Sequence, residues 1–298
     1  MKLITTLSVS ISLLSSGALA DGPRHLTYAT EGGNALDAFV YSPSVDAETL
    51  ESPIPAILMI HGGGWVMGSP WFMSRQSQAL ADEGFVVINI EYRLTDRETG
   101  LNAFPIPVHD TKAAVRWTRA NAAALNVDPD HIGAVGGSAG AHLASLLATS
   151  GDVEELEGDV GEHGNVSSEI QAAVGWAAPF DLIAVAEVDP DDWDGVLAAF
   201  MGGTFDEVPE NYYLASPAEH MDATDPPVLL LHEFEERIVF PTLQTEAFER
   251  GERIIEGFEV VNWEGEEHAF WVPGRGEHDR AEQTIQMTAE FFRKHLSD

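Results

Sequence analysis

In the stretch HIGAVGGSAGAH, residues 131–142, a short apolar run is followed by a cluster of small residues around Ser138. Gly136, Ser138 and Gly140 fit the pattern G-x-S-x-G, in which a serine stands on a tight turn between a strand and a helix. Small neighbours are needed because the backbone passes close to itself there. Residues that favour a helix, AGAHLASLLATS, follow directly. We therefore predict that Ser138 is a nucleophile; a small polar residue in a glycine-rich turn is the alternative.

Further apolar runs of strand length recur along the chain and alternate with helical patterns. Such runs suit strands that are buried on both faces, and the alternation predicts an α/β fold with a mainly parallel sheet and helices on both faces. The expected strands cover residues 56–60, 85–90, 131–135, 172–176, 228–231 and 258–263. Ahead of them, residues 25–43 have the pattern of two antiparallel strands joined at Gly32 and Gly33.

Three helices show an end or a face in the sequence. Asp110 is a plausible N-cap for a helix over residues 111–125, and Gly251 stands where a helix over 242–250 would end. The last helix is expected to bury one face, made of Ile285, Ala289, Phe292 and Leu296.

The first twenty residues, MKLITTLSVSISLLSSGALA, have the features of an export signal. They combine Lys2, an apolar stretch that is short for a bilayer, and Ala18-Leu19-Ala20 as a cleavage site. We expect residues 21–298 to form one domain, in which 181–215 is a short cover insertion. No other stretch has the roughly 18 uninterrupted apolar residues of a membrane span. The mature protein is therefore predicted to be exported, and either periplasmic or secreted.

Composition excludes several classes of site and partner. The chain has no cysteine, which excludes thiolate metal sites, cysteine nucleophiles and disulfides. Its formal net charge of −34 makes nucleic acid a poor partner. We interpret this charge as adaptation to high salt, since the Debye length falls from about 10 to about 3 Å between about 0.1 and about 1 M salt; an ordinary acidic secreted protein is the alternative. The acidic run over 151–164 is interpreted as a solvated loop, with a structural cation site as the alternative.

The stretch HGGGW, residues 61–65, directly follows the strand expected over 56–60. Binding sites in parallel sheets form at the carboxyl ends of the strands. Three glycines leave backbone N–H groups able to point at the oxyanion of a tetrahedral intermediate. We predict an oxyanion hole made by the N–H groups of Gly63, Gly64 and Ala139; a flexible glycine turn is the alternative.

A serine nucleophile requires a base that takes its proton and later returns it to the leaving group. The chain order serine, acid, histidine favours His268, in the stretch GEEHAF (265–270) after the last expected strand. An exposed loop histidine is the alternative. His61 precedes Ser138 and is predicted to be structural, and His142 lies one helical turn beyond Ser138 and is predicted to support the turn.

The acid of the triad is expected in HEFEERIVFP, residues 232–241, where a carboxylate could accept a hydrogen bond from the histidine. Glu233, Glu235 and Glu236 compete for this role, and the stretch contains no aspartate. Asp181, which follows the preceding expected strand, is a further candidate. The residues alone leave this choice open.

Several motifs together resemble the bacterial α/β-hydrolase esterases related to hormone-sensitive lipase and to the feruloyl-esterase-like carbohydrate esterases. The resemblance extends from about residue 25 to the C-terminus and implies an α/β-hydrolase fold. It is carried by HGGGW, EYRL (91–94), residues 109–144, GWAAPFDL (175–182), PPVLLLH (226–232) and EEHAF.

The same resemblance orders the acidic candidates. In those families the loop after the penultimate core strand typically reads H-G-x-x-D-x-x-V-P. Counting from His232 places Glu236 at the aspartate position and Glu233 at the glycine position, with the proline one place late at Pro241. The resemblance therefore implies Ser138, Glu236 and His268 as the triad, with two glutamates that depart from the pattern.

These features predict a serine carboxylesterase that cleaves short-chain, aryl-linked or sugar-linked esters through an acyl-enzyme. Its partner would be a small ester or an acylated saccharide, without a metal or organic cofactor; DPDDWDG (189–195) fails the calcium-loop pattern. A hydrolase-fold binding module with an impaired acid loop and a peptidase of the same fold are the alternatives. Aromatic and apolar residues are expected to line the substrate pocket, with core packing as the alternative for each: Trp65, Met67, Trp71 and Trp193. The oligomeric state is not predicted.

Overall fold

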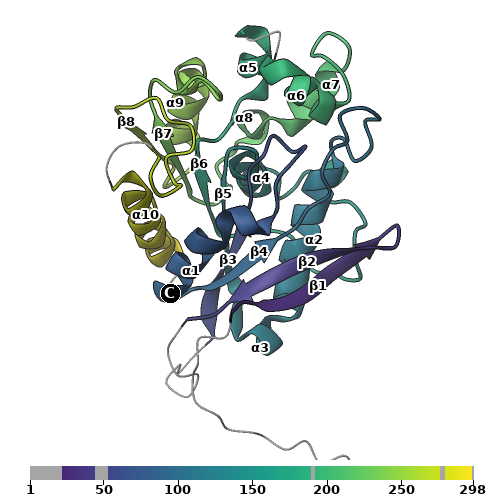
Figure 1. The fold of residues 1–298 in the computed structure, drawn as a ribbon, viewed down its shortest axis with the longest axis vertical. Helices are drawn as coiled ribbons and strands as arrows, with labels where there is room; N and C mark the ends of the chain where they lie inside the picture. The colour runs from purple at the N-terminus through teal and green to yellow at the C-terminus, as the bar shows by residue number, and fades with distance from the viewer. Residues whose placement is uncertain (1–21, 44–52, 189–191, 276–278, 297–298) are drawn as a thin grey trace, which may run out of the picture.

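The computed structural model describes residues 22–43, 53–188, 192–275 and 279–296, so the expected export signal lies outside the described residues. The described residues form an eight-stranded sheet with the order β1-β2-β4-β3-β5-β6-β7-β8 (Figure 1). Its strands are β1 (Arg24–Glu31), β2 (Asn34–Tyr41), β3 (Ile54–Ile60), β4 (Val86–Ile90), β5 (Val127–Gly137), β6 (Ala172–Trp176), β7 (Val228–Glu233) and β8 (Glu259–Trp263).

The sheet is parallel from β4 through β8, and β1 and β2 extend it as an antiparallel pair. The predicted turn at Gly32 and Gly33 is confirmed, and both glycines have positive φ, 58° and 86°. Every residue of β4, β6 and β7 is buried, which explains their nearly unbroken apolar sequences. The predicted fold class, a mainly parallel sheet with helices on both faces, is therefore confirmed.

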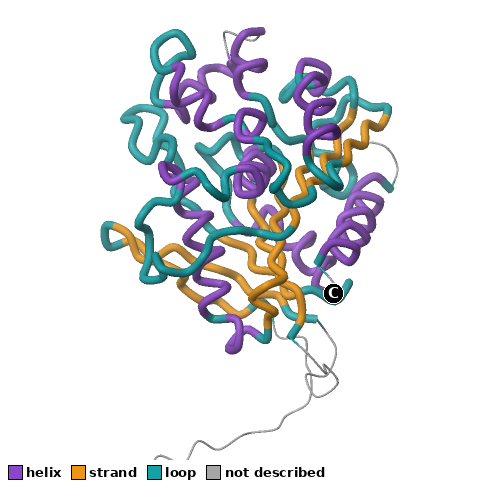
Figure 2. The backbone as a smooth tube through the Cα atoms, turned by 180° about the vertical axis from the view of Figure 1, so that it is seen from behind, coloured by secondary structure: helices purple, strands orange, loops and turns teal. Residues whose placement is uncertain are grey.

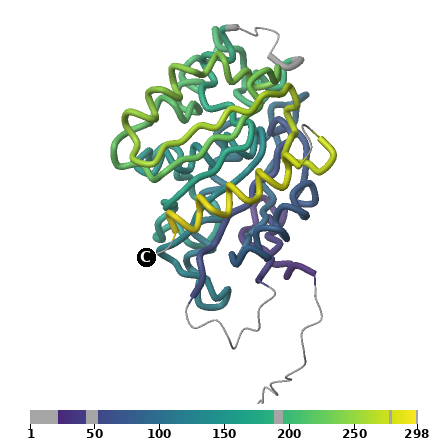
Figure 3. The backbone as a smooth tube through the Cα atoms, turned by 90° about the vertical axis from the view of Figure 1, so that its left-hand side faces the viewer, coloured from purple at the N-terminus to yellow at the C-terminus, as the bar shows by residue number. Residues whose placement is uncertain are grey.

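Helices pack on both faces of the sheet, which Figure 2 shows as a continuous band of strands flanked by helices. α2 (Ile106–Ala120) and α4 (Ala139–Thr149) cover one face, and α1 (Ser74–Asp82) and α10 (Arg280–His295) cover the other, where Figure 3 shows α10 along its full length. On the predicted face, Ala289 and Phe292 of α10 and its C-cap Leu296 are buried, and Ile285 is partly buried. The shorter elements are α3 (Ala122–Leu125), α9 (Thr245–Ile254), η2 (Pro70–Met73), η3 (Glu154–Leu156) and η4 (Pro241–Leu243).

Two predicted helix ends are wrong. α2 begins at Ile106, so Asp110 lies inside the helix rather than at its N-cap, and its buried carboxylate accepts hydrogen bonds from the backbone and guanidinium of Arg93. α9 continues through Gly251, where a Cβ would lie 2.6 Å from the ring of Phe258. In both cases a tertiary contact uses the residue that would otherwise mark a helix end.

The segment over residues 182–220 forms four helices that gather beyond the carboxyl ends of the strands (Figure 1). It also contacts the loops below, since the carbonyl of Phe200 accepts a hydrogen bond from the N–H of Phe104 at 2.7 Å. No helix in the described part of the chain is long and apolar enough to cross a membrane. The helices are α5 (Leu182–Val188), α6 (Asp192–Met201), α7 (Pro209–Ala215) and α8 (Pro217–His220).

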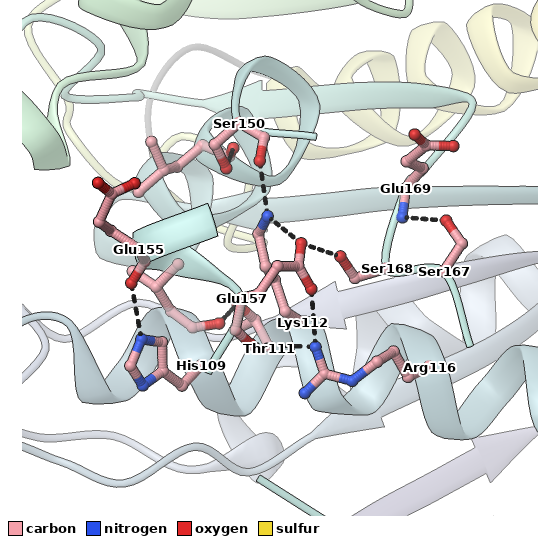
Figure 4. A network of polar contacts seen from close by, with 12 residues as sticks. His109, Thr111, Lys112, Arg116, Ser150, Glu155, Glu157, Ser167, Ser168 and Glu169 are labelled. Carbon is pink, nitrogen blue, oxygen red and sulfur yellow. Dashed lines mark hydrogen bonds and ion pairs between the residues drawn. The ribbon is translucent and has the colours of Figure 1, made fainter. Parts of the chain in front are cut away.

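The acidic run over residues 151–164 is anchored by buried cations (Figure 4). Glu157 accepts a hydrogen bond from Lys112 Nζ at 2.7 Å and another from Arg116 Nη1 at 2.9 Å, and both cationic side chains are almost fully buried. Ser168 Oγ donates to the same carboxylate at 2.6 Å. The interpretation of the whole run as a solvated loop is therefore wrong at Glu157, because α2 supplies two charges that need a counter-ion.

Candidate active site

Ser138 alone makes the turn between β5, which ends at Gly137, and α4, which begins at Ala139. Its backbone has φ 56° and ψ −123°, a positive-φ conformation that costs a residue with a side chain roughly 1–3 kcal/mol. Its N–H donates to the carbonyl of Trp176 at 2.8 Å, and its carbonyl accepts from the N–H of His142 at 3.0 Å. These bonds hold the strained turn and present the side chain at the carboxyl end of the sheet.

The glycines on either side of Ser138 are required by close backbone contacts. A Cβ on Gly136 would lie 2.7 Å from the carbonyl oxygen of Ile60, and one on Gly140 would lie 2.7 Å from the carbonyl oxygen of His61. Both distances are well inside van der Waals contact, so neither position accepts a side chain. The turn therefore packs directly on the end of β3 and on the glycine loop that follows it.

Ser138, His268 and Glu236 meet at the carboxyl ends of the strands. His268 Nε2 lies 2.9 Å from Ser138 Oγ, and His268 Nδ1 lies 2.9 Å from Glu236 Oε2. An ionised carboxylate only accepts hydrogen bonds, so Nδ1 carries the proton, and Nε2 is left to accept from the serine hydroxyl. This neutral tautomer is the one that can remove a proton from the serine.

The Glu236 carboxylate is fully buried, and its own loop folds over it. Oε1 accepts the N–H of Val239 at 2.9 Å, and Oε2 accepts the N–H of Ile238 at 3.2 Å. Burial raises the pKa of Glu236, but the hydrogen bond and charge of His268, together with these N–H groups, outweigh it and bring the pKa below its usual value. The loop thus accommodates the longer side chain of glutamate and keeps it ionised.

The other acidic candidates have different partners. Glu235 is exposed. Asp181 caps α5, because its Oδ1 accepts the N–H groups of Ile183 and Ala184 at 3.1 and 3.0 Å. Glu233 is buried, but it accepts a backbone N–H from the loop of His268 rather than a hydrogen bond from the imidazole. Of the four candidates, only Glu236 is hydrogen-bonded to the ring of His268.

The glycine loop after β3 lies directly against the serine turn. A Cβ on Gly62 would lie 2.6 Å from the carbonyl oxygen of Gly137 and 3.3 Å from Ser138 Cβ. Gly63 and Gly64 follow with φ of 126° and 59°, values that strongly favour glycine. On the other side of the serine, Ala139 begins α4, and the first N–H groups of a helix lack an intrahelical acceptor. The glycine loop therefore contacts the serine turn at Gly62, and the oxyanion role of Gly63, Gly64 and Ala139 stays a prediction.

His61 and His142 are buried beside this site. His142 Nε2 donates to the carbonyl of Ala215 at 2.7 Å, and its Nδ1 accepts from Trp65 Nε1 at 3.2 Å. His61 Nδ1 lies 2.8 Å from the carbonyl of Gly62, and its ring stacks on Tyr92. Burial lowers the pKa of each histidine to about 4. Both are therefore neutral hydrogen-bonding groups, in keeping with the structural roles predicted for them.

The predicted pocket residues divide into three cases. Met67 and Trp71 are 58% and 66% exposed; Met67 adjoins the glycine loop, whereas the ring of Trp71 packs on Phe39 of β2, with centroids 5.3 Å apart. Trp65 is fully buried and its ring stacks on Phe200 at 4.3 Å, so the prediction that it lines a pocket is wrong. Its backbone φ of 60° accompanies this inward placement. The side chain of Trp193 lies outside the described part of the structure.

Two residues at the site carry no distinguishing signal in the sequence. Trp271 stands edge-on to His268, with ring centroids 5.7 Å apart, and a Cβ on Gly137 would lie 2.6 Å from its indole. Gln244 donates to the carbonyl of Val239 at 2.6 Å and so supports the loop that carries the acid. Neither an isolated aromatic residue nor an isolated amide residue indicates in the sequence which group it contacts. The roles of Trp271 and Gln244 are therefore visible only in the folded structure.

Comparisons with known proteins agree with this geometry. A family model described as BD-FAE matches residues 40–250. The probable carboxylic ester hydrolase LipM of Mycobacterium tuberculosis is 28% identical over 230 residues, which cover 75% of this chain and 50% of LipM. The chain thus spans about half the length of the curated relatives it matches.

Solved structures extend the similarity over nearly the whole chain. The esterase Est2 of Thermogutta terrifontis, with propionate bound, is 29% identical with a TM-score of 0.73, covering 92% of this chain and 94% of that one. Est2 is also known with butyrate bound. A bifunctional GH43-CE protein of Bacteroides eggerthii is 28% identical with a TM-score of 0.74, covering 91% of this chain and 38% of that one. The predicted α/β-hydrolase fold is confirmed by these similarities.

Proposed function

The chain belongs to the BD-FAE family, and from this premise we propose that it is a serine carboxylesterase that acts through an acyl-enzyme. The observation that carries the proposal is the hydrogen-bonded path from Ser138 Oγ through His268 to the buried carboxylate of Glu236. The strained turn at Ser138 adds support, because such strain persists where function requires it. The relatives named as esterases support the same reaction class.

In the proposed mechanism, Ser138 Oγ attacks the ester carbonyl while its proton moves to His268 Nε2. The N–H groups of Gly63, Gly64 and Ala139 stabilise the resulting oxyanion. His268 returns the proton to the leaving alcohol as the ester C–O bond breaks, which leaves an acyl-enzyme. Water attacks this intermediate with His268 as base, the acid departs and the serine is restored. Throughout, an ionised acid partner stabilises the imidazolium.

We propose short-chain or aryl esters, including sugar-linked ones, as the substrate class. Met67 is 58% exposed beside the glycine loop, where its Cγ lies 3.2 Å from the position of a Cβ on Gly63, and its apolar surface suits a small acyl or aryl group. The propionate and butyrate complexes of Est2 support short acyl chains. The similarity to the GH43-CE protein supports an ester attached to a saccharide.

Hydrolysis of p-nitrophenyl acetate, butyrate and octanoate and of methyl ferulate tests the proposal. Ser138→Ala is expected to lower kcat about 10⁶-fold on any ester that the wild type cleaves. Ser145→Ala is the matched control, since Ser145 lies in α4 and its buried hydroxyl has no hydrogen-bond partner among the described residues. A folded wild type that cleaves none of these esters would contradict the proposal and favour a binding module.

We also propose that the protein is exported and works in high salt. The apolar leader with its small-residue cleavage site and the net charge of −34 support this. The midpoint of thermal unfolding is expected to rise as NaCl increases from about 0.1 to about 1 M, because salt screens the repulsion between carboxylates. Expression with the native leader, followed by fractionation, tests export. A midpoint that falls with salt would contradict the salt proposal.

A further inference from the structure

The loops that carry Glu236 and His268 are joined by a second buried glutamate, and we propose that Glu233 is a positioning residue for His268. This inference rests on the proposed function, because it concerns the same triad. Glu233 Oε2 accepts the N–H of Glu267 at 2.7 Å, and Glu267 directly precedes His268. The Glu233 side chain is 1% exposed, so water does not compete effectively for this bond.

The bond continues a series of contacts between the two loops. The N–H of Phe234 donates to the carbonyl of Trp263 at 2.8 Å, and the N–H of Glu235 donates to the carbonyl of Gly265 at 2.9 Å. Beyond Gly265 the histidine loop turns, and the Glu233 carboxylate makes the next link. A Cβ on Gly265 would lie 2.5 Å from Glu233 Cδ, so the absence of a side chain at 265 leaves space for this carboxylate.

A cation faces the other oxygen of Glu233. Arg280 Nε, at the start of α10, lies 3.5 Å from Glu233 Oε1, and Arg280 is 9% exposed. The Arg280 guanidinium also lies over the ring of Trp263, 4.4 Å from its centroid. A buried carboxylate requires such a partner. Glu233 is therefore held from α10 while it holds the residue before His268.

This arrangement accounts for one departure of the acid loop from the pattern H-G-x-x-D-x-x-V-P, typical of the esterases that the sequence resembles, in which glycine stands at the position of Glu233. Glycine has no side chain to bind the histidine loop, whereas glutamate reaches the N–H of Glu267. Glu235, two residues further along, is exposed and provides a matched control. The imidazole is then fixed by two carboxylates: Glu236 binds the ring and Glu233 binds the backbone beside it.

The test uses the full chain with three variants and two readouts. The double variant Glu233→Met, Arg280→Met replaces a buried ion pair by apolar side chains, which is often neutral for stability, but it removes the acceptor for Glu267. Glu233→Gln keeps an oxygen acceptor, and Glu235→Met is the control. The readouts are kcat and KM on p-nitrophenyl butyrate and the far-downfield proton NMR resonance of the His268–Glu236 hydrogen bond.

We expect the double variant to lower kcat about 10²-fold with little change in KM and to broaden or remove the resonance, because small displacements of catalytic groups have effects of this size. Glu233→Gln is expected to recover most of the lost kcat, and Glu235→Met to change kcat less than about twofold. A folded double variant that retains both kcat and the resonance would overturn the proposal. If the wild type cleaves no ester, the proposed function fails, while the resonance still decides the role of Glu233.

Discussion

Two acidic stretches of this chain, EELE at 154–157 and EFEE at 233–236, have similar composition. The first supplies a carboxylate to a structural ion pair, and the second supplies one to the proposed catalytic triad. Glu157 binds Lys112 and Arg116, two buried side chains of α2 that serve it only as ion-pair partners. Glu236 binds His268, whose second ring nitrogen lies 2.9 Å from Ser138 Oγ, where it can accept and return a proton. The carboxylates are alike, and the partner that the fold places opposite each one sets its role.

The two sites also differ in which partner is buried, the carboxylate or the group that it binds. At Glu157 the cations are buried, 1% and 2% exposed, while the carboxylate is 36% exposed. At Glu236 the carboxylate is completely buried and the histidine is 15% exposed. A structural pair can expose its acid, because nothing else has to reach it. A catalytic pair has to keep water from its acid and leave its base accessible to substrate.

Within the two acidic stretches, the largest expected effect is the loss of catalysis in Glu236→Gln. The amide oxygen can still accept the N–H of Val239, so we expect the fold to persist. The amide cannot stabilise the imidazolium or fix the tautomer of His268, and kcat/KM on p-nitrophenyl butyrate should fall about 10⁴-fold. A decrease of less than tenfold in a variant with an unchanged thermal unfolding midpoint would mean that Glu236 is not the acid of the triad.

Glu157→Gln should have the opposite profile. It removes the carboxylate that pairs with two buried cations, so after allowance for its partial exposure the free energy of unfolding should fall by about 2 kcal/mol, while kcat of the folded protein stays unchanged. Denaturant unfolding and esterase assays on the same preparation measure both quantities. Glu154→Gln, in the same stretch but exposed, is the control. A loss of kcat in folded Glu157→Gln would remove the distinction between the two stretches.

The same pair predicts how stability depends on pH. Burial raises the pKa of Glu157, but Lys112, Ser168 and Arg116 outweigh it and bring the pKa below its usual 4.5. A carboxyl whose pKa is lower when folded stabilises the fold above its unfolded pKa and loses that contribution as pH falls through the folded pKa. The stability difference between wild type and Glu157→Gln should therefore shrink below about pH 4.5. A difference that grows in acid would contradict the pairing.

The serine turn and the glycine loop could be predicted because their requirements are local. Gly136, Ser138 and Gly140 fit a tight strand-to-helix turn and stand between an apolar run and a helical pattern, and the glycines of HGGGW directly follow an expected strand. The acid could not be chosen in this way. Glu233, Glu235 and Glu236 have the same chemistry within four positions, and the resemblance to known esterases was needed to favour one of them. What separates them is the path of the histidine loop, which is a tertiary feature.

The remaining errors share this cause. Asp110, Gly251 and Trp65 carry local signals for a cap, a helix end and an exposed aromatic. Each residue instead contacts a side chain outside its own element: Arg93 for Asp110, Phe258 for Gly251 and Phe200 for Trp65. Glu157 is a further example, since its cations lie about 40 residues earlier on α2. Local patterns describe what a residue can do, and the partner is fixed only when the elements pack.

A third acidic position, Asp225, tests the comparison because it forms no ion pair with a cation in the described part of the chain. Burial raises the pKa of Asp225 to about 6, and the charges of Asp222 and Asp152 add to this effect. Since the folded pKa exceeds the unfolded 3.8, stability is lost as pH rises through this interval and stays lower at neutral pH. Asp225→Asn keeps an oxygen that accepts the N–H of Asp222. After allowance for partial solvent screening, it should raise the free energy of unfolding by about 1 kcal/mol at about pH 7 and by little at about pH 4.

Glu235→Gln is expected to have the smallest effect. It compares an exposed glutamate with the buried Glu236 of the same stretch, EFEE. Glu235 is exposed, and its backbone N–H, which donates to the carbonyl of Gly265, is unchanged by the substitution. We expect kcat/KM to change less than about twofold and the free energy of unfolding by less than about 0.5 kcal/mol. If Glu235→Gln instead lost as much activity as Glu236→Gln, His268 would be responding to the total charge of EFEE. The hydrogen bond to a single buried carboxylate would then no longer explain the site.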